Sequence, residues 1–95
     1  MSSQTYVIEC ESVIVDGKIA TRITNTRQIV LDKMRQLFPE LPVNDFNYSG
    51  VKTSISRTIL ENNISKLVPN TEDICIWGDI DSKKINTLLN NFTDF

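Results

Sequence analysis

The stretch TYVIECESVIVDGKIATRITN, residues 5–25, gives the clearest structural instruction in this chain. Two runs rich in β-branched residues flank Asp16-Gly17, the dipeptide preferred in a two-residue type I′ turn. The sequence therefore predicts an antiparallel hairpin in which Val15 pairs with Lys18. Every other cross-strand pair follows from that first one.

This register determines which side chains share each face of the hairpin. One face carries residues that need a core, namely Ile8, Cys10, Ile14, Ile19 and Ile23. The other face sets Glu11 opposite Arg22, where an exposed ion pair adds roughly a few tenths of a kcal/mol. A slip of one residue would exchange the two faces, so burial of the apolar face enforces the register.

The next segment, TNTRQIVLDKMRQLFPELP at residues 24–42, changes to a helical period. Its apolar residues repeat at i, i+4, i+7 and i+8, at Val30, Met34, Leu37 and Phe38. Asn25 or Thr26 is expected to cap the helix and Pro39 to end it. The outer face, which we expect in solvent, carries Arg27, Asp32, Lys33, Arg35 and Gln36.

Residues 40–57, ELPVNDFNYSGVKTSISR, allow two interpretations. A second hairpin turning at Ser49-Gly50 would place on one face Phe46, Tyr48, Val51, Thr53 and Ile55. A helix is the alternative, because Val51, Ile55 and Ile59 recur every four residues. These three point roughly 140° away from a second stripe, made by Leu60, Ile64, Leu67 and Val68, so a single straight helix over residues 51–68 has no single buried face.

We therefore predict that the helix in this region begins later. The pattern from Thr58 to Glu61 is that of a capping box, and Pro69 would close the element. Ser54 is an alternative start.

The segment EDICIWGDIDSKK, residues 72–84, begins with an apolar run from Ile74 to Trp77 that shows no alternation. Such a run predicts a central strand covered on both faces. A helix follows in residues 81–92, with apolar residues at Ile85, Leu88, Leu89 and Phe92. Residues 1–95 are thus expected to form a single two-layer α+β domain, in which the hairpin, the central strand and the second hairpin, if present, pack against three helices.

Asp79 and Asp81 lie one residue apart between this strand and this helix, and they are the weak candidates for a metal site. A calcium loop is excluded, because Lys83 and Lys84 occupy positions where that loop needs an oxygen ligand and a glycine. A magnesium site remains an alternative. The preferred interpretation is structural, with Asp81 or Ser82 capping the helix. With no histidine and no glycine-rich phosphate loop, the chain is expected to be no enzyme and to need no cofactor.

Composition narrows the classes of partner. The 95 residues are 40% hydrophobic and 23% charged, with a net charge of −2, which is typical of a globular domain without a strong field. Nucleic-acid binding is therefore a weak alternative, and it would use Phe46 and Tyr48 for stacking and scattered cations, namely Arg27, Lys33, Arg35, Lys52, Arg57, Lys66, Lys83 and Lys84. No apolar run is long enough for a membrane span and the start lacks a signal-peptide pattern, so a cytoplasmic protein with no membrane partner is expected.

The preferred functional hypothesis is a non-enzymatic binding or assembly module. Its predicted partner-binding residues are concentrated in FPELPVNDFNY, residues 38–48, and at the last residue: Phe38, Leu41, Val43, Phe46, Tyr48 and Phe95. The alternative for the first five is a loop closing over the domain's own core. An edge strand over residues 4–15 could add strands from another copy, so a homo-oligomer is about as favoured as a monomer.

The composition, rich in Asn and Ile, suggests a small protein encoded by a virus or mobile element that inhibits a host protein. The second alternative is an oligomer that sequesters a small, nucleotide-like ligand in a crevice between subunits.

Overall fold

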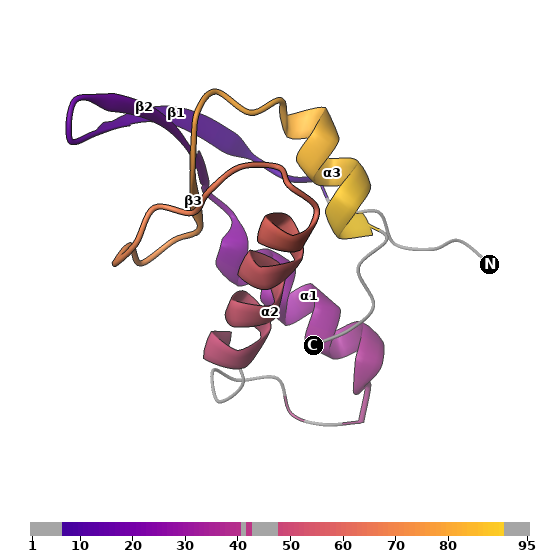
Figure 1. Cartoon of the computed structure of the whole chain (residues 1–95). Coiled ribbons are helices and arrows are strands. Elements are labelled where there is room, and N and C mark those ends of the chain that lie inside the picture. Colours follow the sequence, from indigo (N-terminus) through magenta and orange to yellow (C-terminus); the bar gives the residue numbers. More distant parts are fainter. Residues whose placement is uncertain (1–6, 41, 43–47, 91–95) are drawn as a thin grey trace.

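The computed structural model describes residues 7–40, 42 and 48–90, and shows an α+β domain. Its elements are β1 (Cys10–Val15), β2 (Lys18–Ile23), α1 (Thr26–Leu37), α2 (Tyr48–Glu61), β3 (Cys75–Trp77) and α3 (Ser82–Asn90). The strands form one antiparallel sheet in the order β1-β2-β3. In Figure 1 the β1–β2 hairpin extends from one end of the molecule, away from the helices. The predicted fold class is confirmed.

The hairpin has the predicted register throughout. Val15 pairs with Lys18 at the turn, and Cys10 pairs with Ile23 at the far end. Asp16 and Gly17 both adopt left-handed backbone conformations, with φ of 51° and 75°, as a type I′ turn requires. The predicted contact across the strands is also present, because Arg22 Nε donates to Glu11 Oε1 at 3.1 Å.

The burial of the hairpin differs from the prediction near the turn. Ile8 and Ile23 lie in the core, and Cys10 packs against it. Ile14 and Ile19, in contrast, are 68% and 52% exposed, so their assignment to the core is wrong. The physical reason is geometric: the helices cover only the part of the sheet farther from the turn, and the last residues of the hairpin project beyond them (Figure 1).

Helix α1 has the predicted bounds, but the predicted cap by Asn25 or Thr26 is absent. Val30 and Met34 are buried, and the Phe38 N–H donates to the Met34 carbonyl at the C-terminus. Asn25 precedes the helix but makes no side-chain cap. Its amide instead accepts from the Glu9 N–H and donates to the Val7 carbonyl, which ties the N-terminal segment to the start of α1.

The predicted solvent face of α1 is wrong at Lys33, which is only 4% exposed. Lys33 follows the buried Ile29 by one turn, as Met34 follows Val30. The buried arc of α1 is therefore wider than the stripe of apolar residues alone, and it includes the side chain of this lysine.

Helix α2 overturns the predicted second hairpin. Residues 48–61 form one helix that runs through Ser49-Gly50, and the three residues repeating every four positions, Val51, Ile55 and Ile59, are its buried stripe. The predicted starts at Thr58 and Ser54 are wrong as well. Thr58 lies within the helix, where its hydroxyl donates to the Ser54 carbonyl at 2.8 Å instead of capping an N-terminus.

The conflict between two apolar stripes does not arise, because the helix ends at Glu61. Leu60 is 49% exposed, whereas Leu67 and Val68 reach the interior from the loop that follows. The residues of the second stripe therefore do not lie on one helix, and their helical spacing is coincidental.

Strand β3 is covered on both faces as predicted, but it is not the central strand. That position belongs to β2, which pairs with β1 on one side and with β3 on the other. The far edge of β3 is lined by residues 66–68, where Val68 N–H donates to the Cys75 carbonyl and Trp77 N–H to the Lys66 carbonyl, both at 2.9 Å. Both edges of β3 are thus hydrogen bonded, although β3 is the last strand of the sheet.

Helix α3 buries Ile85 and Leu89 and packs Leu88 against the core, as predicted. Phe92 lies outside the described residues. The main core joins residues from the sheet and from all three helices: Ile8, Ile23, Ile29, Val30, Met34, Val51, Ile55, Ile59, Ile74, Ile76, Ile85 and Leu89.

Replacing Gly50 by alanine distinguishes the helix from a hairpin turn. A Cβ at Gly50 meets no atom within 4 Å, and its backbone is not left-handed. Gly50→Ala is therefore expected to raise the free energy of unfolding by about 0.5 to 1 kcal/mol in a urea titration. Gly17→Ala is the control and should lower it by about 1 kcal/mol, because Gly17 is left-handed. Loss of stability in both variants would contradict the helix.

Candidate functional site

The turn between β3 and α3 crosses the sheet and is held by Thr21 of β2. The Thr21 hydroxyl donates to the Gly78 carbonyl at 2.7 Å and accepts from the Ile80 N–H at 2.9 Å. Thr21 is buried, and Gly78 is left-handed, with φ of 98°. One hydroxyl therefore satisfies two main-chain groups and fixes the path of the chain as it leaves the sheet.

The side chains of Asp79 and Asp81, on either side of Ile80, have different hydrogen-bond partners. Asp79 is exposed, and its Oδ1 accepts a hydrogen bond from Ser12 Oγ at 3.4 Å. Asp81 precedes the first residue of α3, and its Oδ1 accepts from the Lys83 N–H at 2.9 Å. This is the predicted N-cap, so Asp81 has a structural role.

A metal centre finds little support in this geometry. Within residues 7–40, 42 and 48–90, no group of three Cys, Asp or Glu side chains gathers that could hold an ion. The helix cap engages Asp81 Oδ1, so an ion at Asp79 and Asp81 would have to bind a carboxylate that already accepts a hydrogen bond.

Most of the predicted partner surface cannot be compared with the structure. Phe38 is 40% exposed at the end of α1. Leu41, Val43, Phe46 and Phe95 lie outside the described residues, as does the side chain of Tyr48, the first residue of α2. Phe38 is thus the one predicted contact residue whose side chain is described.

A different apolar surface is present on the hairpin, and we call it the hairpin arm: residues 12–21 of β1, β2 and their turn. Ile14 and Ile19 are cross-strand partners and are both exposed, so they form a continuous apolar pair. The crossing turn at Ser12 and Thr21 separates this pair from the core. Sequence analysis missed the arm because it assigned the whole face to the core. The proximity of both residues to the turn was the available signal.

The opposite face of the arm is partly covered. Ala20 is buried with Val68 and Cys75, and Val13, Val15 and Trp77 pack against them. Lys18 Nζ lies 5.8 Å from the centre of the Trp77 ring, within the range of a cation–π contact. This face therefore presents partly buried apolar side chains beside a cation.

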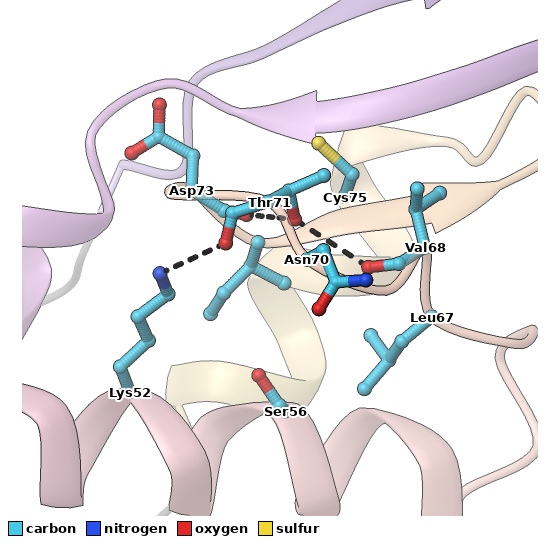
Figure 2. A pocket seen from close by; sticks show the side chains of 9 residues that line it. Lys52, Ser56, Leu67, Val68, Asn70, Thr71, Asp73 and Cys75 are labelled. Atoms are coloured by element: carbon cyan, nitrogen blue, oxygen red, sulfur yellow. Dashed lines mark hydrogen bonds between the residues drawn. The ribbon is translucent and has the colours of Figure 1, made fainter. Parts of the chain in front are cut away.

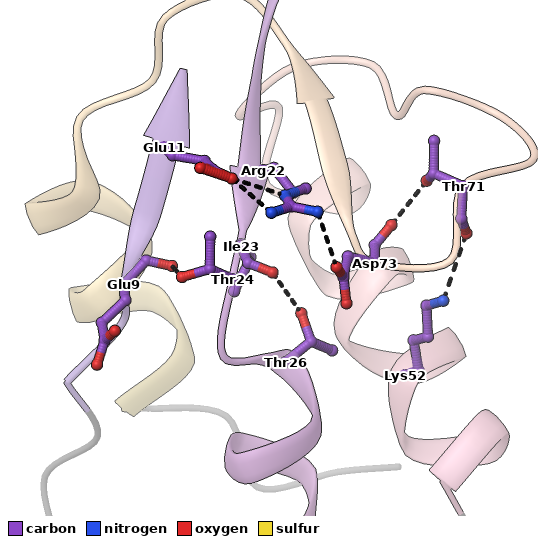
Figure 3. A network of polar contacts seen from close by, with 9 residues as sticks. All are labelled: Glu9, Glu11, Arg22, Ile23, Thr24, Thr26, Lys52, Thr71 and Asp73. Carbon is purple, nitrogen blue, oxygen red and sulfur yellow. Dashed lines mark hydrogen bonds and ion pairs between the residues drawn. The ribbon is translucent and has the colours of Figure 1, made fainter. Parts of the chain in front are cut away.

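A line of polar contacts joins the sheet to the loop before β3 (Figure 3). Arg22 binds Glu11 across the hairpin and contacts Asp73 Oδ2 at 3.4 Å. The hydrogen bond to Glu11, with its negative charge, raises the pKa of Arg22 above its ordinary value. The Thr71 hydroxyl donates to the Asp73 carbonyl at 2.7 Å, and Lys52 Nζ lies 3.4 Å from the Thr71 carbonyl. These bonds anchor the loop to β2 and α2.

A small pocket lies beneath that loop, with a volume of about 110 Å³. Figure 2 shows Lys52 and Ser56 of α2 on one side and the loop on the other. Its remaining lining residues are Leu67, Val68, Asn70, Thr71, Asp73, Ile74 and Cys75. Drug-sized ligands occupy cavities of roughly 300–1,000 Å³, so this pocket holds nothing as large as a nucleotide.

The two cysteines lie in different apolar clusters, Cys10 against the main core and Cys75 in the smaller one. Cys75 is buried, and both thiols are free. Partial burial raises the pKa of the Cys10 thiol, so Cys10 is protonated at neutral pH. The two residues therefore pack as small apolar side chains.

No family model, no curated protein and no solved structure matches this chain. Its function is therefore inferred from the geometry of the structure. None of the helices described has the length and apolar character that crossing a membrane requires.

The bonds of Thr21 to the crossing turn are testable by removing the hydroxyl. Thr21→Val keeps the shape of the side chain but leaves the Gly78 carbonyl and the Ile80 N–H without their partner. We expect a loss of about 1 to 3 kcal/mol in the free energy of unfolding, measured with urea. Thr21→Ser keeps the hydroxyl and should lose only about 0.8 kcal/mol, for one methyl group. Equal losses in the two variants would assign the effect to packing.

The cap at Asp81 makes a second prediction. Asp81→Ala should lower the free energy of unfolding by about 1 kcal/mol, whereas Asp81→Asn should change it little, because asparagine caps as well as aspartate does. Thermal midpoints of the unsubstituted protein with and without magnesium are expected to coincide. A midpoint that rises with magnesium and no longer does so in Asp81→Asn would indicate a metal site.

Proposed function

We propose that this domain is a non-enzymatic protein-binding or assembly module that acts through its hairpin arm. The observation that carries the proposal is the joint exposure of Ile14 and Ile19 on a projecting hairpin. Burial of apolar surface contributes about 25 cal/mol per Å², so a partner that covers this pair gains free energy from both side chains. Contiguous apolar patches exposed on a protein surface mark interaction sites.

The structural roles of the reactive side chains favour binding over catalysis. Asp81 caps a helix, and Asp79 accepts a hydrogen bond from Ser12. The Cys10 thiol has a raised pKa, and the chain contains no histidine. We therefore retain the proposal that the protein is not an enzyme.

The alternatives receive less support. Lys33, one of the cations suggested for nucleic-acid binding, is buried, and Lys52 is directed at the Thr71 carbonyl. The pocket beneath the loop is too small for a nucleotide-like ligand, so the sequestering alternative requires a crevice between two copies. The proposal includes an inhibitor of a host protein that is encoded by a virus or mobile element and acts in the cytoplasm. The predicted surface at Phe38, Leu41, Val43, Phe46, Tyr48 and Phe95 is proposed as a second contact.

A charge-neutral double substitution tests the arm. Ile14→Glu with Ile19→Lys replaces the apolar pair by a cross-strand ion pair, which keeps the hairpin paired and leaves the net charge unchanged. The tagged protein and the variant are used to capture proteins from a lysate of the source cell at low and at high salt. Capture is expected to be lost in the double variant, which should keep its circular dichroism spectrum.

Leu60→Gln is the matched control, because Leu60 is 49% exposed and belongs to α2, outside the residues of the arm. Its capture should equal that of the unsubstituted protein. Retention of the same proteins by the arm variant would contradict the proposal. Captured nucleic acid that is released as salt rises would instead support the nucleic-acid alternative, since phosphate contacts weaken with salt.

A further inference from the structure

Strand β1 has an open edge. In the described part of the chain β2 is its one neighbour in the sheet. In an antiparallel hairpin with a two-residue turn, the pair next to the turn exchanges both main-chain hydrogen bonds, and every second pair does so after it. Glu11, Val13 and Val15 therefore bond to β2, and the N–H and C=O groups of Ser12 and Ile14 point to the open edge.

The bonds on the other side of β2 confirm this alternation. The Ile19 carbonyl accepts from Gly78 N–H and the Ile23 N–H donates to the Ile74 carbonyl, so these residues direct their main-chain groups toward β3. Ile19 is the cross-strand partner of Ile14 and Ile23 that of Cys10. The main-chain groups of Ile14 hence face away from β2.

The exposed edge of β1 has few of the features that prevent an edge strand from pairing with another chain. Residues 12–15, Ser-Val-Ile-Val, contain no charge and no proline, and three of the four are β-branched and apolar. Natural proteins protect edge strands with lysine, proline, bulges or a covering element. An apolar edge segment without these features favours pairing with another strand.

We infer that β1 pairs antiparallel with β1 of a second copy of this chain, about a two-fold axis at Val13. The inference rests on the proposed function and specifies its partner as the protein itself. Antiparallel pairing continues the sheet across the axis and places the helices of the two copies at opposite ends of the new ladder. The helices therefore do not meet.

Registers centred on Glu11, Ser12, Val13 or Ile14 all let the outward groups of both copies meet, and charge and strand length favour the one at Val13. Glu11 opposite Glu11 would oppose like charges. Ser12 opposite Ser12 would bring two Asp79 carboxylates together, because each Ser12 donates to its own Asp79 at 3.4 Å. Ile14 opposite Ile14 would pair only residues 13–15, since the turn begins at Asp16.

With Val13 opposite Val13, the paired segment is residues 11–15 of both copies. Ser12 and Ile14 then exchange main-chain hydrogen bonds between copies. The apolar cluster around Ala20 becomes continuous across the axis through the two Val13 side chains.

The charges of the two copies also match in this register. Glu11 lies opposite Val15 of the second copy, whose cross-strand neighbour is Lys18. Each Glu11 then lies between its own Arg22 and the uncharged Val15 of the second copy, with Lys18 of that copy one strand farther along the same face. This complementarity favours a second copy over an unrelated strand.

Cysteine cross-linking tests the register directly. Val13 and its symmetry mate would form a non-hydrogen-bonded pair, in which the Cα atoms are about 4.5 Å apart, within the range for a disulfide. Val13→Cys in a Cys10→Ala background is therefore expected to form a covalent dimer under mild oxidation. Glu11→Cys, Ser12→Cys and Ile14→Cys in the same background are the controls, one for each rejected register. A faster dimer from any of these three would overturn the Val13 axis.

A proline tests the main-chain pairing itself. Ile14→Pro removes an N–H that points to the open edge, and proline is tolerated on edge strands, so the hairpin should still form. In sedimentation equilibrium the unsubstituted protein and Ile14→Thr, which keeps the N–H, are expected as dimers and Ile14→Pro as a monomer. The circular dichroism spectrum verifies that each variant is folded.

The outcomes separate this inference from the proposed function. An unsubstituted protein that stays monomeric at every concentration, with no Val13→Cys dimer, overturns self-pairing. If capture of other proteins still depends on Ile14 and Ile19 in that case, the arm binds a different chain and the proposed function stands. If the protein forms no dimer and capture does not depend on Ile14 and Ile19, both proposals are overturned.

Discussion

The left-handed turn at Asp16-Gly17 is the constraint on which the rest of the sheet depends. A two-residue turn leaves no freedom in the pairing of the strands beside it, so it determines the partner of every residue from Cys10 to Ile23. It places Thr21 opposite Ser12, where the chain crosses back over the sheet. The core on one side of that crossing and the exposed arm on the other both follow from this register.

Thr21 divides the hairpin into two parts with different physical roles. Toward the helices, Ile23 lies among apolar side chains from all three of them. Toward the turn, Ile14 and Ile19 have no such cover and remain in solvent. The hydroxyl sits at the boundary because the turn from Gly78 to Ile80 needs a buried donor and acceptor at that point. A polar residue in the middle of an apolar face thus marks where the core ends.

The two faces of the arm differ, and the difference bears on what the arm can bind. One face is closed by the loop before β3, which Arg22 and Lys52 hold in place through Asp73 and Thr71. The other face and the open edge of β1 are left for a partner. A strand added at this edge obtains main-chain hydrogen bonds and an apolar contact at the same time, which is the usual basis of recognition by strand addition. Self-pairing requires no other molecule, and the alternation of Glu11, Arg22 and Lys18 suits it.

Much of the fold could be predicted from local patterns in the sequence. The turn dipeptide, the helical period of residues 30–38 and the apolar run before Gly78 each specify their structure within a few neighbouring residues, and the capping role of Asp81 follows from its place before a helix. Helix α2 could not be predicted in this way, because two apolar stripes competed. Where the helix ends decides between them, and that depends on residues 66–68 pairing with β3.

The exposure of the candidate surface at Ile14 and Ile19 could not be predicted from the sequence alone. The alternation of the hairpin determined which side chains share a face, and therefore that Ile14 and Ile19 lie together. Whether that face is buried depends on how far the helices extend along it, and this is set by packing between segments distant in the sequence. The periodicity of the sequence indicates the face toward which a side chain points. Its exposure depends on which other segments pack against that face in the folded protein.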